Sequence, residues 1–108
     1  MLNPSTGDPA PIFAALGDRT RLALLSKLGD GQARSIAALS TDTALTRQAI
    51  TKHLHVLQDA GLVASLKVGR ESRFAARREA LDEARAYLDV VSRQWDDTLG
   101  RLKAFVED

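Results

Sequence analysis

The residues best suited to chemistry lie between positions 44 and 78, where cations, amides, hydroxyls and imidazoles gather with few carboxylates. At 3.6 residues per turn, residues 46–60 predict a helix whose inward side holds Ala49, Ile50, His53, Leu54 and Leu57. The opposite side holds Arg47, Gln48, Thr51, Lys52, His55 and Gln58. No carboxylate follows on this side before Asp59. Solvated helix faces usually mix both signs, whereas these side chains suit base edges and phosphates, so the stripe predicts a helix that enters a DNA groove.

Both ends of this helix carry residues suited to ending it. The Thr46 hydroxyl can accept a hydrogen bond from an unpaired amide of the first turn, which predicts Thr46 as the N-cap. Gly61 tolerates the left-handed conformation found just past a last turn, so we expect the helix to stop there.

The segment after Gly61 changes to an extended pattern. Apolar residues flank a break at 69–72, and they are Leu62, Val63, Leu66, Val68, Phe74 and Ala75. A glycine within the break suits a turn, so residues 63–76 predict a hairpin. Lys67, Arg70 and Arg73 lie on or beside that turn, where long cations can reach a phosphate backbone. The hairpin alone could serve solubility only, but beside the cationic helix we interpret it as a second DNA-contacting element.

The charge distribution favours the same division. Residues 44–78 hold seven Lys and Arg against two Asp and Glu, whereas residues 79–108 hold four against eight. The near-neutral total of +1 therefore hides a basic block, which is what the release of counterions from DNA requires.

Composition limits the class of protein. A chain of 108 residues with 44% apolar and 27% charged residues is typical of one globular domain. Cysteine is absent, which removes disulfide, thiolate-metal and cysteine-nucleophile chemistry. No apolar run of membrane-spanning length and no signal peptide occur, so we expect a cytoplasmic protein without membrane partners.

Three shorter segments precede the cationic helix. Residues 1–10 are rich in Pro, Ser, Gly and Asp and predict a loose leader, and Pro11 is expected to open a first helix carrying Ile12, Phe13 and Leu16. Asp18 is the expected cap of a second helix, whose leucines are Leu22, Leu25 and Leu28 with Leu24 alongside. Residues from Ser35 to about Thr41 predict a short third helix, and the four-residue link 42–45 then gives a helix-turn-helix.

The last segment predicts one long helix from Glu79 to about Glu107. Its apolar stripe steps by three or four residues through Leu81, Ala84, Leu88, Val91, Trp95, Leu99 and Leu102. A helix of this length reaches roughly 40 Å, which is more than so small a domain can cover. We therefore expect a symmetric dimer in which the first and last helices pair with their copies. The alternative is a helix folded back over its own core.

Three stretches of the chain resemble the ArsR/SmtB-type winged helix-turn-helix regulators of transcription. They are ALGDRTRLALLSKL, TRQAITKHLHVLQDAGLV and KVGRESRFA. The resemblance covers residues 11–78 and implies a mostly α fold with a small β-hairpin, the wing, followed by a dimerisation helix at 79–108. It implies a homodimer that binds double-stranded DNA at a palindromic operator, with half-sites about 34–36 Å apart.

Site residues follow from the same resemblance. The expected DNA-binding residues are Thr46, Arg47, Gln48, Thr51, Lys52 and His55 in the recognition helix and Lys67, Arg70 and Arg73 in the wing. The expected dimer interface comprises Ile12, Phe13, Leu16, Leu81, Leu88, Val91, Trp95, Leu99 and Leu102.

The sequence departs from the metal-sensing members of that family. Where those members often carry a cysteine pair, this chain has Ser35, Ile36 and Ala37, and its last helix contains no histidine. His53 and His55 are two residues apart on a helix and cannot face one way. We expect a half-buried His53, an exposed His55, no metal or other cofactor, and an effector that the sequence does not identify.

Two other classes of function compete with that of a regulator. An enzyme would need a nucleophile with a base or paired carboxylates in a cleft, and the acidic residues at 82, 83, 96 and 97 are more simply a solvated helix face, so no catalysis is expected. A winged-helix module that binds proteins and not DNA stays open. Among regulators, repression is preferred, because binding alone can block polymerase.

Overall fold

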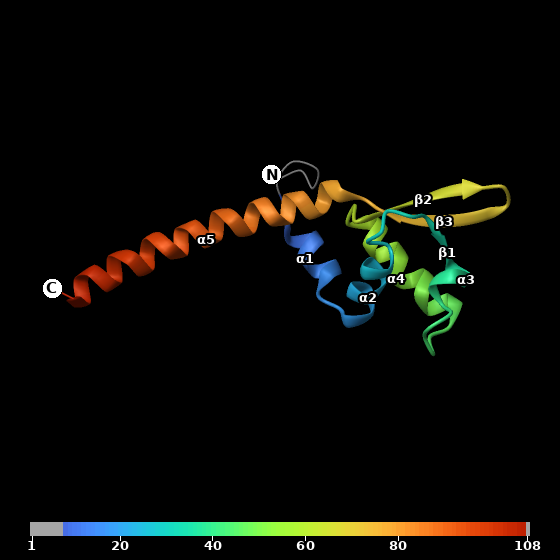
Figure 1. Cartoon of the computed structure of the whole chain (residues 1–108), viewed down its shortest axis with the longest axis horizontal. Coiled ribbons are helices and arrows are strands. Elements are labelled where there is room, and N and C mark those ends of the chain that lie inside the picture. The colour runs from blue at the N-terminus through green and yellow to red at the C-terminus, as the bar shows by residue number, and fades with distance from the viewer. Residues whose placement is uncertain (1–7, 108) are drawn as a thin grey trace.

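Most of the chain is helical, and the last helix projects far from the other elements (Figure 1). A computed structural model describes residues 8–107. Its elements are α1 (Ala10–Leu16), α2 (Arg19–Lys27), β1 (Arg34–Ser35), α3 (Ile36–Leu39), α4 (Arg47–Asp59), β2 (Val63–Val68), β3 (Glu71–Ala76) and α5 (Arg78–Glu107). Most of the expected leader, residues 1–7, lies outside the described residues. The leader's last residue, Ala10, already belongs to α1.

The sheet has three antiparallel strands in the order β1-β3-β2, one more strand than the sequence predicted. Arg34 and Ser35 pair with Phe74 and Arg73 of β3. The third helix is correspondingly shorter than expected. Ser35 keeps an extended backbone while its hydroxyl accepts a hydrogen bond from the Ala38 amide at 3.1 Å, so the strand ends and the helix begins at one residue.

The same helix also ends earlier than the expected Thr41. The Ser40 hydroxyl donates to the Ala37 carbonyl at 2.8 Å, and the Thr41 hydroxyl donates to the Ala38 carbonyl at 2.9 Å. These hydroxyls thus share the last carbonyls of the helix with the Ser40 and Thr41 amides. The helix ends at Leu39, with Ser40 as its C-cap.

The hairpin turn is tighter than the predicted four-residue break. Glu71 and Ser72 belong to β3 and pair with Val68 and Lys67, which leaves a two-residue turn. Gly69 opens the turn with φ +65°, a conformation that residues with a side chain rarely adopt.

Thirteen apolar side chains form the core between the helices and one face of the sheet. They are Ile12, Ala15, Leu24, Leu28, Leu39, Ile50, Leu54, Leu57, Leu62, Val63, Phe74, Ala80 and Ala84. Leu24 of α2 and Leu28, the C-cap of the same helix, are buried, and they are four residues apart and share one face. Leu22 is 50% exposed, so the predicted leucine stripe was wrong at that position.

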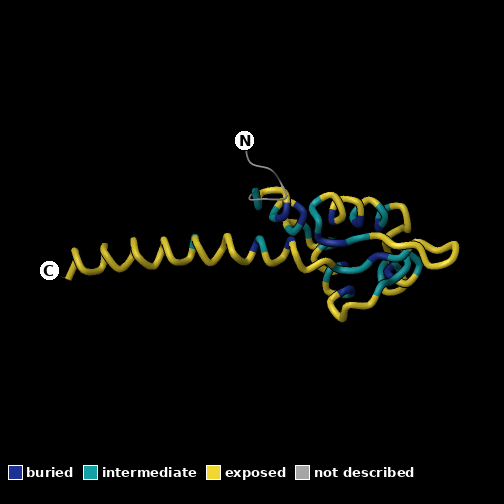
Figure 2. The backbone as a smooth tube through the Cα atoms, turned by 90° about the horizontal axis from the view of Figure 1, so that it is seen from above, coloured by how far each residue is buried: buried dark blue, intermediate teal, exposed yellow. Residues whose placement is uncertain are grey.

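The long helix α5 contacts the rest of the chain only near its beginning. Ala80 and Ala84 are buried, and the Tyr87 ring meets the Phe13 ring of α1 edge-on at 5.8 Å between centroids. Beyond these residues α5 extends alone, and the molecule measures 67 × 32 × 23 Å (Figures 1 and 2). The alternative in which this helix folds back over its own core is therefore wrong. Among the described helices, none combines the length and the apolar character needed to cross a membrane.

A glycine closes α4 through two backbone hydrogen bonds. The Gly61 amide donates to the Gln58 carbonyl at 2.9 Å, and the Leu62 amide donates to the Leu57 carbonyl at 2.9 Å. This pair of bonds is the Schellman motif, which needs a left-handed residue, and Gly61 has φ +79°. The predicted helix stop at Gly61 is confirmed.

Gly61→Ala should lower the free energy of unfolding by about 1–2 kcal/mol, because an L side chain is strained at this φ. A Cβ atom there would meet only the Ala80 Cβ at 3.7 Å, so backbone strain and not a clash is the cause. Gly100→Ala is the matched control, because Gly100 lies within α5, where an added Cβ would meet no atom of another element within 4 Å, so this substitution should not destabilise the chain. Urea unfolding of both variants checks this, and equal effects would contradict it.

Candidate nucleic-acid interface

The helix α4 begins at a capped end that faces outward. The Thr46 hydroxyl accepts a hydrogen bond from the Ala49 amide at 3.0 Å, which confirms the predicted N-cap. On the inner side Ile50, Leu54 and Leu57 are fully buried. This burial fixes the rotation of the helix, so the opposite side faces solvent.

The predicted polar residues of α4 lie on that solvent side. Arg47, Gln48, Lys52 and His55 are exposed. Thr51 is half-buried, and its hydroxyl donates to the Arg47 carbonyl at 2.7 Å. The Thr51 hydroxyl proton is therefore already used within the helix, and its oxygen remains an acceptor.

A hollow of about 750 Å³ lies between α3 and the first half of α4. Its lining consists of Ile36, Ala37, Thr46, Arg47, Gln48, Ala49, Thr51, Lys52 and His55. All six residues expected to bind DNA from the helix meet there, and no carboxylate is among the lining residues. The hollow thus joins an apolar edge from α3 to donors from α4.

The structure separates the three cations predicted for the hairpin. Side chains alternate along a strand, so Lys67 shares a face with Ser65, whose hydroxyl lies 3.4 Å from the Gln58 amide nitrogen of α4. Arg73 pairs with Leu66 across the strands and lies on the other face, where its Nε contacts the Glu71 carboxylate at 2.6 Å. Lys67 is therefore on the side of α4, whereas Arg73 is turned away and partly neutralised.

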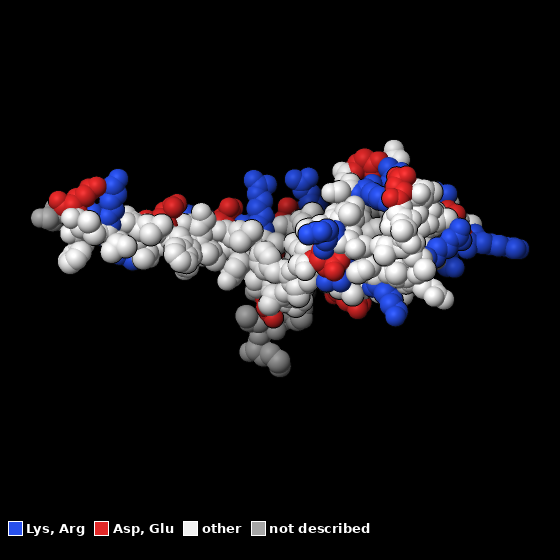
Figure 3. All heavy atoms as spheres, turned by 90° about the horizontal axis from the view of Figure 1, so that it is seen from below, with Lys and Arg blue, Asp and Glu red and all other residues white. Residues whose placement is uncertain are grey.

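Arg70 lies at the exposed tip of the hairpin. Lys and Arg side chains gather at this end of the molecule in the space-filling view (Figure 3). The hairpin projects beyond the helices, so Arg70 can contact a surface that the helices do not reach (Figure 1).

The residues expected at a dimer interface divide into three groups by their exposure. Ile12 is 3% exposed and belongs to the subunit's own core, so its side chain offers almost no surface to a partner. Phe13, Leu16 and Val91 are half-buried. The exposed members all lie on α5, and they are Leu81, Leu88, Trp95, Leu99 and Leu102.

Arg21 was missed by sequence reasoning, although it joins three helices. Its Nε donates to the Ala15 carbonyl at 2.6 Å, its Nη2 donates to the Ala14 carbonyl at 3.3 Å, and its Nη1 lies 3.3 Å from His53 Nδ1. His53 is half-buried, as expected.

The cap of α2 lies beside this arginine. The hydrogen bond from the Arg21 backbone amide, at 3.0 Å, lowers the pKa of the Asp18 carboxyl below its usual value, and the Arg21 guanidinium adds to the effect. Between residues 8 and 107 no three His, Asp or Glu side chains are grouped closely enough to hold a metal ion.

Comparisons with known sequences agree with this geometry. A family model described as a helix-turn-helix domain matches residues 16–65. The uncharacterized HTH-type transcriptional regulator YuzN of Bacillus subtilis (strain 168) is 43% identical, and the match covers 59% of this chain and 76% of that protein.

Solved structures share the fold. An ArsR-like transcriptional regulator from Rhodococcus sp. RHA1 has a TM-score of 0.80 at 41% identity, covering 90% of this chain and 91% of that one. The homodimeric winged helix-turn-helix DNA-binding domain of Mb0332 from Mycobacterium bovis, a possible ArsR-family regulator, has a TM-score of 0.60 at 26% identity, covering 85% and 82%. The expected fold is confirmed, and the protein is a regulator and not an enzyme. The chain belongs to the ArsR family of winged helix-turn-helix transcriptional regulators.

Proposed function

We propose that this regulator is a homodimer that represses transcription by binding a palindromic operator. In this proposal residues 11–78 form the DNA-binding region and residues 79–108 the dimerisation helix. The observation that carries it is the outward side of α4, where cations, an amide, hydroxyls and an imidazole surround one hollow without a carboxylate. Anionic phosphates and base edges are the surface that such donors fit.

Each part of the surface has a separate role in the proposal. Arg47, Gln48, Thr51, Lys52 and His55 contact bases and phosphates from within the major groove, and Thr46 positions the first turn. Lys67 and Arg70 hold the phosphate backbone from the wing. Arg73, paired with Glu71 on the other face of the wing, contributes less than the sequence suggested.

The exposed apolar residues of α5 support a dimer, and with it a palindromic operator. The exposed apolar side chains of this helix are costly in water, and pairing with the same helix of a second subunit would bury them symmetrically. Twofold symmetry presents two recognition helices to half-sites about 34–36 Å apart. Repression is the simplest output, because occupancy of the duplex by itself excludes polymerase.

Salt dependence tests whether the chain binds DNA. The exposed cations Arg47, Lys52, Lys67 and Arg70 number four per subunit, so a dimer offers eight. With six to ten phosphate contacts, affinity for a duplex selected from a random pool should fall by about 10³ to 10⁵ between roughly 50 and 200 mM salt. Fluorescence anisotropy measures this fall. A chain that ignores every duplex but captures another protein independently of salt would be an interaction module instead.

Substitutions in α4 and in the wing should have different effects on binding, because the first contacts bases and the second contacts phosphates. Arg47→Ala or Gln48→Ala should cost about 1–3 kcal/mol on the preferred sequence and relax the preference at one position, because a base contact is lost. Arg70→Ala should weaken all duplexes alike, because a phosphate carries no sequence information. Competition binding with point-mutated duplexes measures both. A change of base preference in Arg70→Ala would refute the wing assignment.

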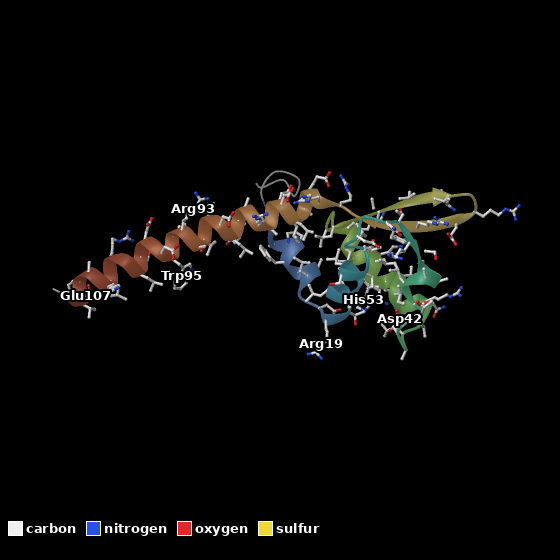
Figure 4. The ribbon with its side chains drawn as sticks, viewed as in Figure 1. Arg19, Asp42, His53, Arg93, Trp95 and Glu107 are labelled. Carbon is white, nitrogen blue, oxygen red and sulfur yellow. The ribbon has the colours of Figure 1, made fainter. Side chains whose placement is uncertain are left out.

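Trp95→Ala should weaken the dimer by about 2 kcal/mol or more, which is roughly 30-fold in Kd, and should lower operator affinity with it. Trp95 is 61% exposed in the single chain and needs a partner to bury it. Arg93→Ala is the control, since Arg93 and Trp95 point to opposite sides of α5 (Figure 4). Sedimentation velocity at several concentrations checks both, and an unchanged profile for Trp95→Ala would count against pairing through this stripe.

A further inference from the structure

One guanidinium connects the end of α1 to the middle of the recognition helix. Carbonyls in the last turn of a helix lack the usual amide partner, and Arg21 supplies a donor to that of Ala15 and a second donor to that of Ala14, which also accepts from the Gly17 amide. The same planar group points its third nitrogen at His53 on α4. Arginine suits this role because its donors are held in one rigid fork.

The contact with His53 has a defined direction. A guanidinium only donates, so in this 3.3 Å contact Arg21 is the donor and the His53 Nδ1 is the acceptor. The Asp18 carboxylate is 3.8 Å from the same Nδ1, which is too long for a hydrogen bond. Arg21 is therefore the partner that orients the ring.

The contacts of Arg21 connect α1 and α5, the helices proposed to form the dimer, to the recognition helix α4. Phe13 of α1 packs against Tyr87 of α5, so α1 is joined to the helix that carries the exposed stripe. Arg21 then joins α1 to α4. Burial of Ile50, Leu54 and Leu57 fixes the rotation of α4, and the hydrogen bonds of the guanidinium, which prefer narrow angles, add a directional constraint between α1 and α4. The guanidinium thus supplies a polar contact that constrains the angle of α4 relative to α1.

We infer that Arg21 is a positioning residue that sets the separation and angle of the two recognition helices, and through them the half-site spacing that the dimer accepts. This inference rests on the proposed function. His53 is the point on α4 at which Arg21 acts, and neither residue needs to touch DNA for this role.

The test uses the duplex that the wild-type protein selects from a random pool, together with versions lengthened or shortened by one central base pair. One base pair turns the half-sites by about 35° relative to each other, since about 10–10.5 base pairs make a turn. The wild-type protein should bind the altered duplexes at least about tenfold more weakly. In Arg21→Gln this penalty should shrink to about threefold or less, as measured by anisotropy.

A double-mutant cycle separates positioning from stability. His53→Leu removes the acceptor on α4 and leaves the bonds from Arg21 to α1, so it should shrink the spacing penalty as Arg21→Gln does. Adding Arg21→Gln to His53→Leu should change the penalty no further, because both break one link. Additive effects, or equal losses on all three spacings, would overturn the inference.

The matched control is Arg34→Gln. Arg34 also donates to a carbonyl, that of Lys27 at 3.1 Å, and contacts Asp30, but it joins α2 to β1 and should leave the spacing penalty intact. If Arg21→Gln fails to fold, His53→Leu alone tests the inference. A spacing penalty in His53→Leu equal to that of the wild-type protein would then refute it. A wild-type protein that selects no duplex refutes the proposed function, whereas one that binds all spacings equally refutes only this inference.

Discussion

The burial of one edge of α4 is the constraint on which the rest of the structure depends. Ile50, Leu54 and Leu57 are fully buried among the core side chains of the neighbouring helices and the sheet. Since a helix is rigid about its own axis, the position of these three side chains determines where every polar residue of α4 points. The cap at Thr46 and the glycine stop at Gly61 then set its length. The surface proposed to face DNA is therefore a consequence of core packing.

The bounds and the orientation of α4 could be predicted from local patterns in the sequence. The periodicity of residues 46–60, the hydroxyl at Thr46 and the glycine at 61 act over a few residues each, so they could be predicted without knowledge of the remaining chain. The two-residue strand β1 could not, because it has no period of its own and depends on pairing with Phe74 and Arg73, about forty positions away. For the same reason the opposite faces of Lys67 and Arg73 followed only from the strand register.

The candidate site shows the same division between local and distant signals. The polar stripe of α4 was predictable residue by residue, whereas the Arg21 link was not, because Arg21 and His53 are 32 positions apart. Charge near a helix start is usually solvated, and the sequence does not show that this guanidinium turns inward. Ile12 was expected at the dimer interface but lies in the subunit's own core. An apolar residue on a short helix fits either place, and its sequence position alone does not distinguish them.

The short connection between α4 and β2 has a consequence for how this surface can vary. Only Ala60, Gly61 and Leu62 separate the two elements, and the Leu62 amide is bonded back to α4. An insertion there would break the core as well as the register. At the far end of the hairpin, a Cβ on Gly69 would meet no atom within 4 Å. The positive φ of Gly69 still favours glycine in a two-residue turn, but no neighbouring element limits a longer tip, so the length of the hairpin can change without disturbing the core that orients α4.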